Sequence, residues 1–204
     1  MKYPITILNL IECFKKLPGI GEKTAERLAL SILEYDDETI ELFSKSLKDT
    51  KTKIRRCEKC NNLSETELCE ICKDKTRNKK LLCVVEDPKN VILFEKLNIF
   101  DGYYHVLDGL ISPMDGINPE DINLASLIDR VKKDKIEEII LALKPSIEGE
   151  TTSLYISKIL EEIDVKITKI AYGIPIGAEI DYVDSLTLEM ALENRMDIST
   201  NKDS

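Results

Sequence analysis

The sequence predicts an α/β protein, and three features of its 204 residues support that prediction. From residue 81 onward, short apolar runs alternate with amphipathic segments, which is the order of a mainly parallel sheet covered by helices. Before residue 81, apolar residues recur at helical spacing, and four closely spaced cysteines follow. The chain is therefore expected to pass from helices to a cysteine-rich segment, then to a sheet domain with a helical tail.

Three helices are expected in the first part. Apolar residues recur at helical spacing over residues 5–17, and Pro-Gly-Ile-Gly at 18–21 ends this helix, because proline lacks a backbone donor and glycine relaxes the backbone limits. A second helix is expected over 22–33, and a third over 37–53 that ends in a basic run. The cysteine-rich residues 57–72 are too short and polar to form a core of their own.

The sheet domain is expected to alternate strands and helices. Asp87-Pro88 and Asn118-Pro119 each combine a capping side chain with proline at the first helical position, so each is expected to start a helix. The first of these helices ends near residue 97, and the second carries the apolar residues of 122–131. Strands are expected at 81–85, 103–107, 138–143 and 165–172, and further helices at 151–162 and 185–195.

The composition is typical of a globular protein, with 43% hydrophobic and 33% charged residues. No apolar run approaches the ~18 residues that a membrane helix needs. The N-terminal pattern is interrupted by Asn9 and Glu12, unlike the unbroken apolar stretch of a signal peptide. We therefore expect a cytoplasmic protein without a membrane partner.

The net charge of −9 hides an asymmetry along the chain. Residues 1–80 carry 17 lysines and arginines against 14 acids, whereas residues 81–204 carry 12 against 24. The basic excess is concentrated in the runs 45–59 and 73–80. A polyanion would therefore meet the N-terminal part, although either run alone is as readily an ordinary solvated surface.

Four cysteines predict a metal site. Cys57 and Cys60, then Cys69 and Cys72, form two Cys-x2-Cys pairs, and two such turns can close a tetrahedron around Zn²⁺. In a reducing cytosol this pattern favours metal over disulfides. A structural zinc supplies folding free energy on the order of 10 kcal/mol, which a small polar segment needs. We predict one structural Zn²⁺ per chain; an iron–sulfur cluster or a redox dithiol pair is the alternative.

The turn at 18–21 predicts DNA binding. Gly19 and Gly21 let the backbone approach a phosphate, and the free N–H groups at the start of the next helix point toward it. Lys23 and Arg27 are four residues apart, so they share one face of that helix and can flank one strand of nucleic acid. Such binding is blind to sequence. The alternative is a plain helical corner with two incidental basic residues. The motif resembles the helix-hairpin-helix of DNA repair proteins.

Acidic residues follow two expected strands, at the edge where α/β sheets usually place their sites. Glu86 follows the first strand, and Glu148 and Glu150 follow the third. This pattern resembles the Toprim domain of topoisomerases, primases and related nucleases, in which a glutamate and an Asp-x-Asp pair hold Mg²⁺ for phosphoryl transfer. Lys144 and Ser146 occupy the Asp-x-Asp positions here. We therefore expect the glutamates to be vestigial acids or a partner contact that holds Mg²⁺ weakly at most, without catalysis.

Other reactive residue types form no catalytic pattern. His105, the single histidine, has no cysteine nucleophile or serine triad arrangement around it and is interpreted as structural. Cys13 and Cys83 fall in an expected helix and an expected strand, and are interpreted as buried small hydrophobes. The sequence contains no Gly-x4-Gly-Lys-Ser/Thr loop, so nucleotide hydrolysis has no support.

The order of these modules resembles the bacterial recombination mediator RecR family, over residues from about 5 to 195. Further similar stretches lie at 104–107, 112–116, 148–151 and 173–184. Lys144 stands where the family usually has asparagine, and Lys169 where arginine is usual, so details of the Toprim face are not carried over.

The resemblance implies four modules within the α/β fold class. These are a helix-hairpin-helix module for DNA binding and oligomerisation (1–54), a four-cysteine zinc finger (55–78), a Toprim domain with a Rossmann-like, mainly parallel sheet (79–172), and a C-terminal segment exchanged between subunits (173–204). It further implies a homotetrameric ring that encircles DNA. With RecO, and in some bacteria RecF, such a ring helps RecA replace single-strand-binding protein at gaps.

Two other classes of function stay open from the sequence alone. One is a Mg²⁺-dependent Toprim nuclease or primase-like enzyme that uses the three glutamates, against which Lys144 and Ser146 argue. The other is a zinc-stabilised interaction protein that never touches DNA.

Overall fold

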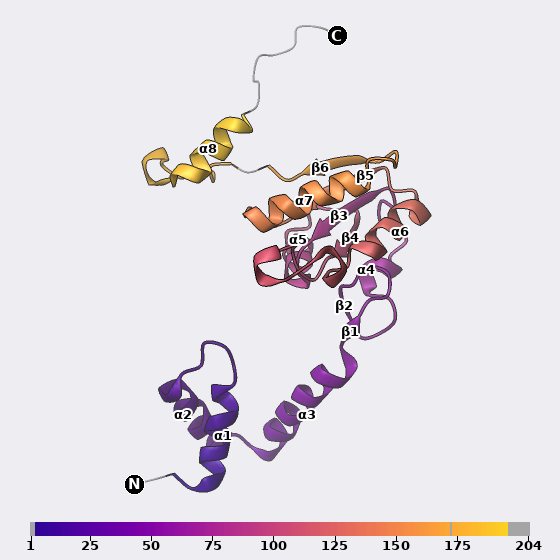
Figure 1. The fold of residues 1–204 in the computed structure, drawn as a ribbon. Coiled ribbons are helices and arrows are strands. Elements are labelled where there is room, and N and C mark those ends of the chain that lie inside the picture. The colour runs from indigo at the N-terminus through magenta and orange to yellow at the C-terminus, as the bar shows by residue number, and fades with distance from the viewer. Residues whose placement is uncertain (1–2, 172, 196–204) are drawn as a thin grey trace. The chain divides into compact units, whose positions relative to one another are not determined.

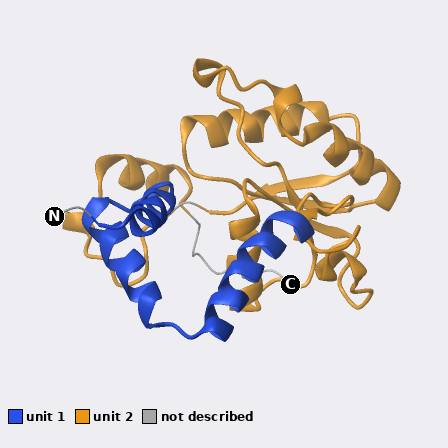
Figure 2. Ribbon diagram, turned by 90° about the horizontal axis from the view of Figure 1, so that it is seen from below, with its two compact units in different colours: residues 1–54 blue, residues 55–204 orange. Residues whose placement is uncertain are grey.

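The chain divides into two compact units, residues 1–54 and residues 55–204 (Figures 1 and 2). The computed structural model describes residues 3–171 and 173–195. In its described part, the first unit contains helices, and the second contains the cysteine-rich segment, the sheet and the C-terminal helix.

Two packed helices form the core of the first unit. Helix α1 (Ile5–Lys15) and helix α2 (Glu22–Ser31) are joined by the glycine turn, and η1 (Ile32–Glu34) extends α2. Alanine at two core positions lets α2 approach α1 closely. The core consists of Ile11, Ala25 and Ala29, with Ile7, Leu10, Phe14 and Ile20 packed against it.

Helix α3 (Asp37–Lys53) has the bounds that the sequence predicts. The side chain of Asp36 caps it by accepting a hydrogen bond of 2.8 Å from the backbone N–H of Thr39. Acids in the first turn and lysines in the last turn complement the helix dipole. None of its side chains is buried, and an apolar row lies exposed: Leu42, Phe43 and Leu47.

The cysteine-rich segment has more regular structure than the loop that the sequence predicts. Strand β1 (Arg55–Arg56) pairs antiparallel with β2 (Leu63–Ser64), and the one-turn helix α4 (Glu70–Lys73) follows. Elements of two and four residues are too short for any hydrophobic period to show them.

The sheet is fully parallel, as the alternation of elements predicts. It consists of β3 (Leu81–Val85), β4 (Tyr103–Val106), β5 (Glu138–Ala142) and β6 (Lys166–Lys169), in the spatial order β4-β3-β5-β6. Strands β4 and β6 are therefore the two edge strands, and the carboxyl ends of all four strands meet at one side of the sheet.

Helices cover both faces of the sheet (Figure 1). Helix α5 (Pro88–Leu97) covers one face, and α6 (Leu124–Asp134) and α7 (Ile147–Ile159) cover the other. Alternate side chains of β3 enter the two cores, because side chains alternate along a strand. The core beneath α6 and α7 includes Leu82, Val84, Leu127, Ile139 and Ile156, and the core beneath α5 includes Cys83, Val85 and Val91.

The helix expected after Asn118-Pro119 starts later than predicted. Pro119 starts only the short helix η3 (Pro119–Asp121). The Asp121 carboxylate accepts a hydrogen bond of 2.8 Å from the Asn118 N–H and so joins the two ends of this turn. Ile122 then extends into the core, where it is 7% exposed. Burial of this side chain interrupts the helical path, and α6 begins only after Asn123.

Helix α7 starts at Ile147, earlier than the expected residue 151, because the Ser146 hydroxyl accepts a hydrogen bond from the Gly149 N–H and caps it. Strand β6 is shorter than expected; Tyr172, at the end of the expected strand, lies outside the described residues. Cys83 is buried as predicted, but the prediction for Cys13 is wrong, since it lies exposed on α1. The short helices η2 (Pro113–Asp115) and η4 (Ile180–Tyr182) precede α8 (Ser185–Glu193).

Candidate metal centre and nucleic-acid interface

The four cysteines converge on one point. The sulfur atoms of Cys57, Cys60, Cys69 and Cys72 all lie within 4.8 Å of one another. Four thiolates at ~2.3 Å from one zinc ion would stand about 3.8 Å apart, so the cluster fits a single tetrahedral ion. Its size leaves no room for the bridging sulfides of an iron–sulfur cluster. Three of the cysteines are buried and the fourth is half-buried, as in a closed structural site.

Local backbone geometry positions each cysteine pair. The first pair lies on a tight turn after β1, in which the Cys57 N–H donates to the Asn62 carbonyl at 2.7 Å and Asn61 adopts a left-handed conformation. The second pair flanks the start of α4, and the Cys69 N–H donates to the Cys57 sulfur at 3.3 Å. Hydrogen bonds among the four thiols, the largest from Cys60, lower the pKa of Cys57 and raise the pKa of Cys60, because the sulfur atoms are close enough to share protons.

The zinc-binding turn is attached to the edge of the sheet. The Val106 N–H, at the end of β4, donates to the Cys60 carbonyl at 2.9 Å, and the Asn61 side chain donates to the Val106 carbonyl at 3.2 Å. Arg56 adds an ion pair of 2.5 Å with Asp108. The outer edge of β4 is therefore covered by the turn that carries the first two ligands.

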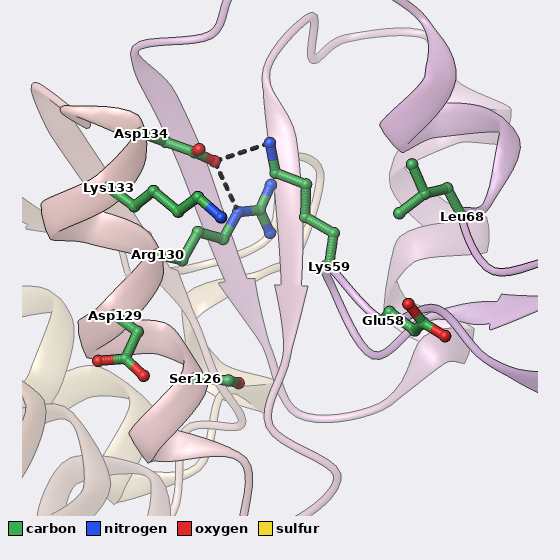
Figure 3. Close-up of a pocket in the computed structure, with 8 residues that line it drawn as sticks. All are labelled: Glu58, Lys59, Leu68, Ser126, Asp129, Arg130, Lys133 and Asp134. Carbon is green, nitrogen blue, oxygen red and sulfur yellow. Dashed lines mark ion pairs between the residues drawn. The ribbon is translucent and has the colours of Figure 1, made fainter.

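A hollow of about 400 Å³ lies between this turn and α6 (Figure 3). Asp134 pairs with Lys59 at 2.8 Å and with Arg130 at 3.5 Å. The Arg130 side chain is 5% exposed, and its guanidinium donates to the Tyr104 carbonyl at 2.5 Å. Because Asp134 pairs with both cations and joins the turn to α6, we interpret the hollow as part of a structural junction. No local sequence pattern marks its partners, which lie far apart in the chain.

The glycine turn is open to a ligand. Gly19 has a φ of +78°, which glycine adopts without strain, and Gly21 is the N-cap of α2 without a side-chain cap. A Cβ added at either glycine would meet no atom within 4 Å, so space is open around the turn. Lys23 and Arg27 are exposed, and neither has an ion pair or hydrogen bond with any residue that the structure describes. The structure thus leaves all four residues accessible to a polyanion.

The acidic residues of the sheet edge are arranged differently from a metal site. Glu86 directly follows β3, whereas Glu148 and Glu150 lie in the first turn of α7. Lys169 pairs with both carboxylate oxygens of Glu150, at 3.1 and 3.0 Å. Within the described ranges, the four cysteines form the one group of three or more potential ligands close enough to share an ion.

Lys144 and Ser146 also engage this edge. The Ser146 hydroxyl, helped by the Glu148 backbone amide and the Lys144 ammonium, lowers the pKa of Glu148. The carboxylate is thus already stabilised by protein groups. Gly149 packs so tightly that an added Cβ would lie 1.9 Å from the Lys144 carbonyl oxygen.

His105 is buried in the sheet, in line with its interpretation as structural. Its Nε2 atom lies 2.8 Å from the Asn123 carbonyl oxygen, and the Asn123 side chain donates to the Val106 carbonyl at 3.1 Å. Burial lowers the pKa of His105 to about 4. The imidazole therefore joins the start of α6 to β4 in its neutral form.

Comparisons with known proteins give the same order of modules. Four family models match: the RecR helix-hairpin-helix over residues 7–51, the RecR four-cysteine zinc finger domain over 54–74, the Toprim domain over 80–171 and the RecR C-terminal region over 173–196. The zinc-finger model and the cysteine cluster together support one zinc ion per chain. No helix in the described ranges is long and apolar enough to cross a membrane.

Curated relatives match along almost the whole chain. The Recombination protein RecR of Staphylococcus aureus, in strains JH9, Newman and COL, is 46% identical over 198 residues. The match covers 97% of this chain and 100% of each relative. With all four modules matched in order, the chain belongs to the RecR family of recombination proteins.

Proposed function

We propose that this RecR-family protein is a non-enzymatic scaffold that binds DNA without regard to sequence. In this proposal it acts in the cytoplasm with RecO, and in some bacteria with RecF, to promote RecA loading on gapped or single-stranded DNA. The observation that carries the proposal is the open glycine turn with two unengaged cations beside it. Backbone N–H groups at a helix start, flanked by cations, recognise phosphate by charge and shape and carry no base information.

The sheet edge supports a non-enzymatic role. Magnesium in phosphoryl-transfer sites is held by carboxylates with near-octahedral geometry. Here Lys144 and Ser146 replace the paired aspartates, and Lys169 already pairs with Glu150. We propose that Glu86, Glu148 and Glu150 are vestigial or contact a basic partner protein.

Exposed apolar surface supports self-association. The apolar row of α3, formed by Leu42, Phe43 and Leu47, has no cover within the described first unit. Apolar side chains of the C-terminal segment are also exposed: Ile176, Ile180, Tyr182, Leu186 and Leu192. Exposed apolar surface that is larger than a monomer usually shows is typical of protein interfaces. We propose a homotetrameric ring built through module 1–54 and exchange of segment 173–204, with modules 55–78 and 79–172 between them.

DNA-binding measurements on two matched double variants test the proposed role of the turn. Lys23→Ala/Arg27→Ala removes the two cations beside it, and Lys45→Ala/Lys48→Ala removes two exposed lysines from α3 in the same unit. Affinity falls as salt rises, with a log–log slope of about −0.9 per phosphate neutralised on duplex DNA. The first variant should bind DNA more weakly than wild type, and by the same factor for unrelated sequences. Its log–log slope should be flatter by about one to two for each copy of module 1–54 that contacts the DNA.

The second variant should keep the wild-type slope. If the slope instead flattens in the α3 variant and stays unchanged in the turn variant, the DNA contact lies on α3 and the proposed role of Gly19, Gly21, Lys23 and Arg27 is wrong.

A further inference from the structure

A hollow of about 430 Å³ extends along the exposed side of α2 in the first unit. Lys23 and Arg27 line it in the first two turns of the helix, and Leu30 and Glu34 line it at the far end. Tyr3, which precedes α1, lines the same hollow. Because α1 and α2 are joined by a tight turn and pack together, the beginning of α1 lies beside the end of α2.

The two ends of the hollow differ in the chemistry of the side chains that line them. Lys23 and Leu30 are about 10 Å apart along the helix axis, at 1.5 Å per residue. The Lys23 end is cationic. The other end offers two partly exposed apolar side chains, Tyr3 at 39% and Leu30 at 38%, next to the carboxylate of Glu34. Glu26, between the two cations in sequence, also lines the hollow.

This division limits what the hollow can hold. A phosphate can bind between Lys23 and Arg27, but a backbone that continued along α2 would bring a second phosphate toward Glu34, which repels it. The apolar end suits a neutral, flat group instead. A nucleobase has that shape, its face stacks on a tyrosine ring, and the exocyclic amino groups of adenine, cytosine and guanine can donate to a carboxylate.

We propose that the hollow beside α2 binds one unpaired nucleotide, with its phosphate at Lys23 and Arg27 and its base stacked on Tyr3. A base inside a duplex presents no free face, so this site selects single-stranded DNA or the unpaired base at a gap. The inference rests on the proposed binding of phosphate at Lys23 and Arg27, and it adds a base-contacting residue and a preference among DNA forms.

The test uses the full-length protein and oligonucleotides that contain 2-aminopurine, a fluorescent base whose emission is quenched by stacking. Tyr3→Leu removes the aromatic ring, whereas Tyr3→Phe keeps the ring and removes only the hydroxyl. Tyr35→Leu is the matched control, because Tyr35 is the other exposed tyrosine of the described first unit and does not line the hollow. Affinity for single strands and for duplex is measured in parallel, and circular dichroism checks that each variant is folded.

Wild type, Tyr3→Phe and Tyr35→Leu should quench 2-aminopurine in a single strand. Tyr3→Leu should lose the quenching and bind single strands roughly 5- to 150-fold more weakly, the effect of one lost base–aromatic stack. Duplex affinity should change by less than about twofold, since paired bases make no stack with the ring. Glu34→Gln should reduce any preference for oligo(dC) over oligo(dT), because thymine has no exocyclic amino group.

The Tyr3 variant and the Lys23/Arg27 variant test the base stack and the phosphate contact separately. If Tyr3→Leu keeps wild-type quenching and single-strand affinity while Lys23→Ala/Arg27→Ala loses binding, the stacking site is wrong and the phosphate contact stands. If Lys23→Ala/Arg27→Ala binds like wild type, the proposed role of the turn is wrong, and with it the inference built upon it.

Discussion

The backbone carbonyl of Cys60 accepts a hydrogen bond of 2.9 Å from the amide of Val106. A zinc ligand and the last residue of β4 are thereby joined through their main chains. The side chain of Cys60 belongs to the metal centre, and its carbonyl belongs to the edge of the sheet. Any change that unfolds the zinc-binding turn should therefore also loosen the end of β4.

Replacing Cys60 with serine should remove the zinc and expose the end of β4. Wild type should contain about one zinc ion per chain, and a three-ligand site loses the closed tetrahedron whose formation supplies folding free energy on the order of 10 kcal/mol. Metal analysis should find the variant nearly free of zinc, and hydrogen exchange should be faster at Val106. Cys13→Ser is the control, because Cys13 is exposed on α1 and lies outside the metal centre. This variant should retain its zinc and the wild-type rate of hydrogen exchange at Val106. Full zinc content in Cys60→Ser would contradict the assignment.

Gly149→Ala should destabilise the second unit. The new methyl group would lie 1.9 Å from the Lys144 carbonyl oxygen, which is backbone and cannot move aside cheaply. Overpacking of this kind costs about 1–3 kcal/mol or more, and urea denaturation measures it. Gly173→Ala is the matched control, since an added Cβ there meets no atom within 4 Å and its change should be within about 0.5 kcal/mol of zero. Equal midpoints for the two variants would contradict the close approach of α7 to Lys144.

Stability should fall on acidification because of His105. Burial lowers the pKa of this imidazole from 6.5 to about 4 in the folded protein. Below pH 6.5 the unfolded chain binds a proton that the folded chain does not, so the free energy of unfolding decreases until both states are protonated near pH 4. The full effect is about 3 kcal/mol, at about 1.4 kcal/mol per pKa unit. Unfolding measured between pH 7 and pH 4 should be less steeply pH-dependent in His105→Gln than in wild type. Parallel curves would show that His105 is not held neutral.

Glu86→Gln should remove no catalytic activity. The acids at the sheet edge do not converge on one point, and Lys144 and Ser146 replace the aspartates that would complete a magnesium site. Labelled single-stranded, duplex and gapped DNA incubated with Mg²⁺ should stay intact with wild type and variant alike. Mg²⁺-dependent cleavage by wild type that disappears in the variant would favour the alternative of an active Toprim enzyme.

Features that depend on nearby residues could be predicted from the sequence. The cysteine spacing predicts a cluster of four sulfurs, and the structure contains it. The alternation of elements predicts a parallel sheet, and the parallel pairing confirms it. The predicted start of α7 is wrong because a serine cap and the packing of glycine against Lys144 decide it, and neither appears in an apolar period. The predicted start of α6 is wrong because burial of Ile122 interrupts the helical path.

Contacts between distant segments could not be predicted. The ion pair between Lys59 and Asp134 joins the zinc-binding turn to α6, and the hydrogen bond from Arg130 to the Tyr104 carbonyl joins α6 to β4. Each residue by itself is typical of a solvated surface charge. Their roles follow from a tertiary arrangement that no single segment encodes.

Because the outer edge of β4 is covered, a further strand could pair with this sheet only at its other edge, β6. The carbonyls of Tyr104 and Val106 already accept hydrogen bonds from protein side chains, so an incoming chain finds few free groups at that edge. In the described part of the sheet, β6 is the edge left uncovered, and lysines stand at both of its ends, Lys166 and Lys169. Lysine on an edge strand discourages pairing with another sheet. One edge of the sheet is thus occupied by the zinc-binding turn and the other carries lysines, so strand pairing between copies of the chain, and with it growth into fibrils, is disfavoured at both edges.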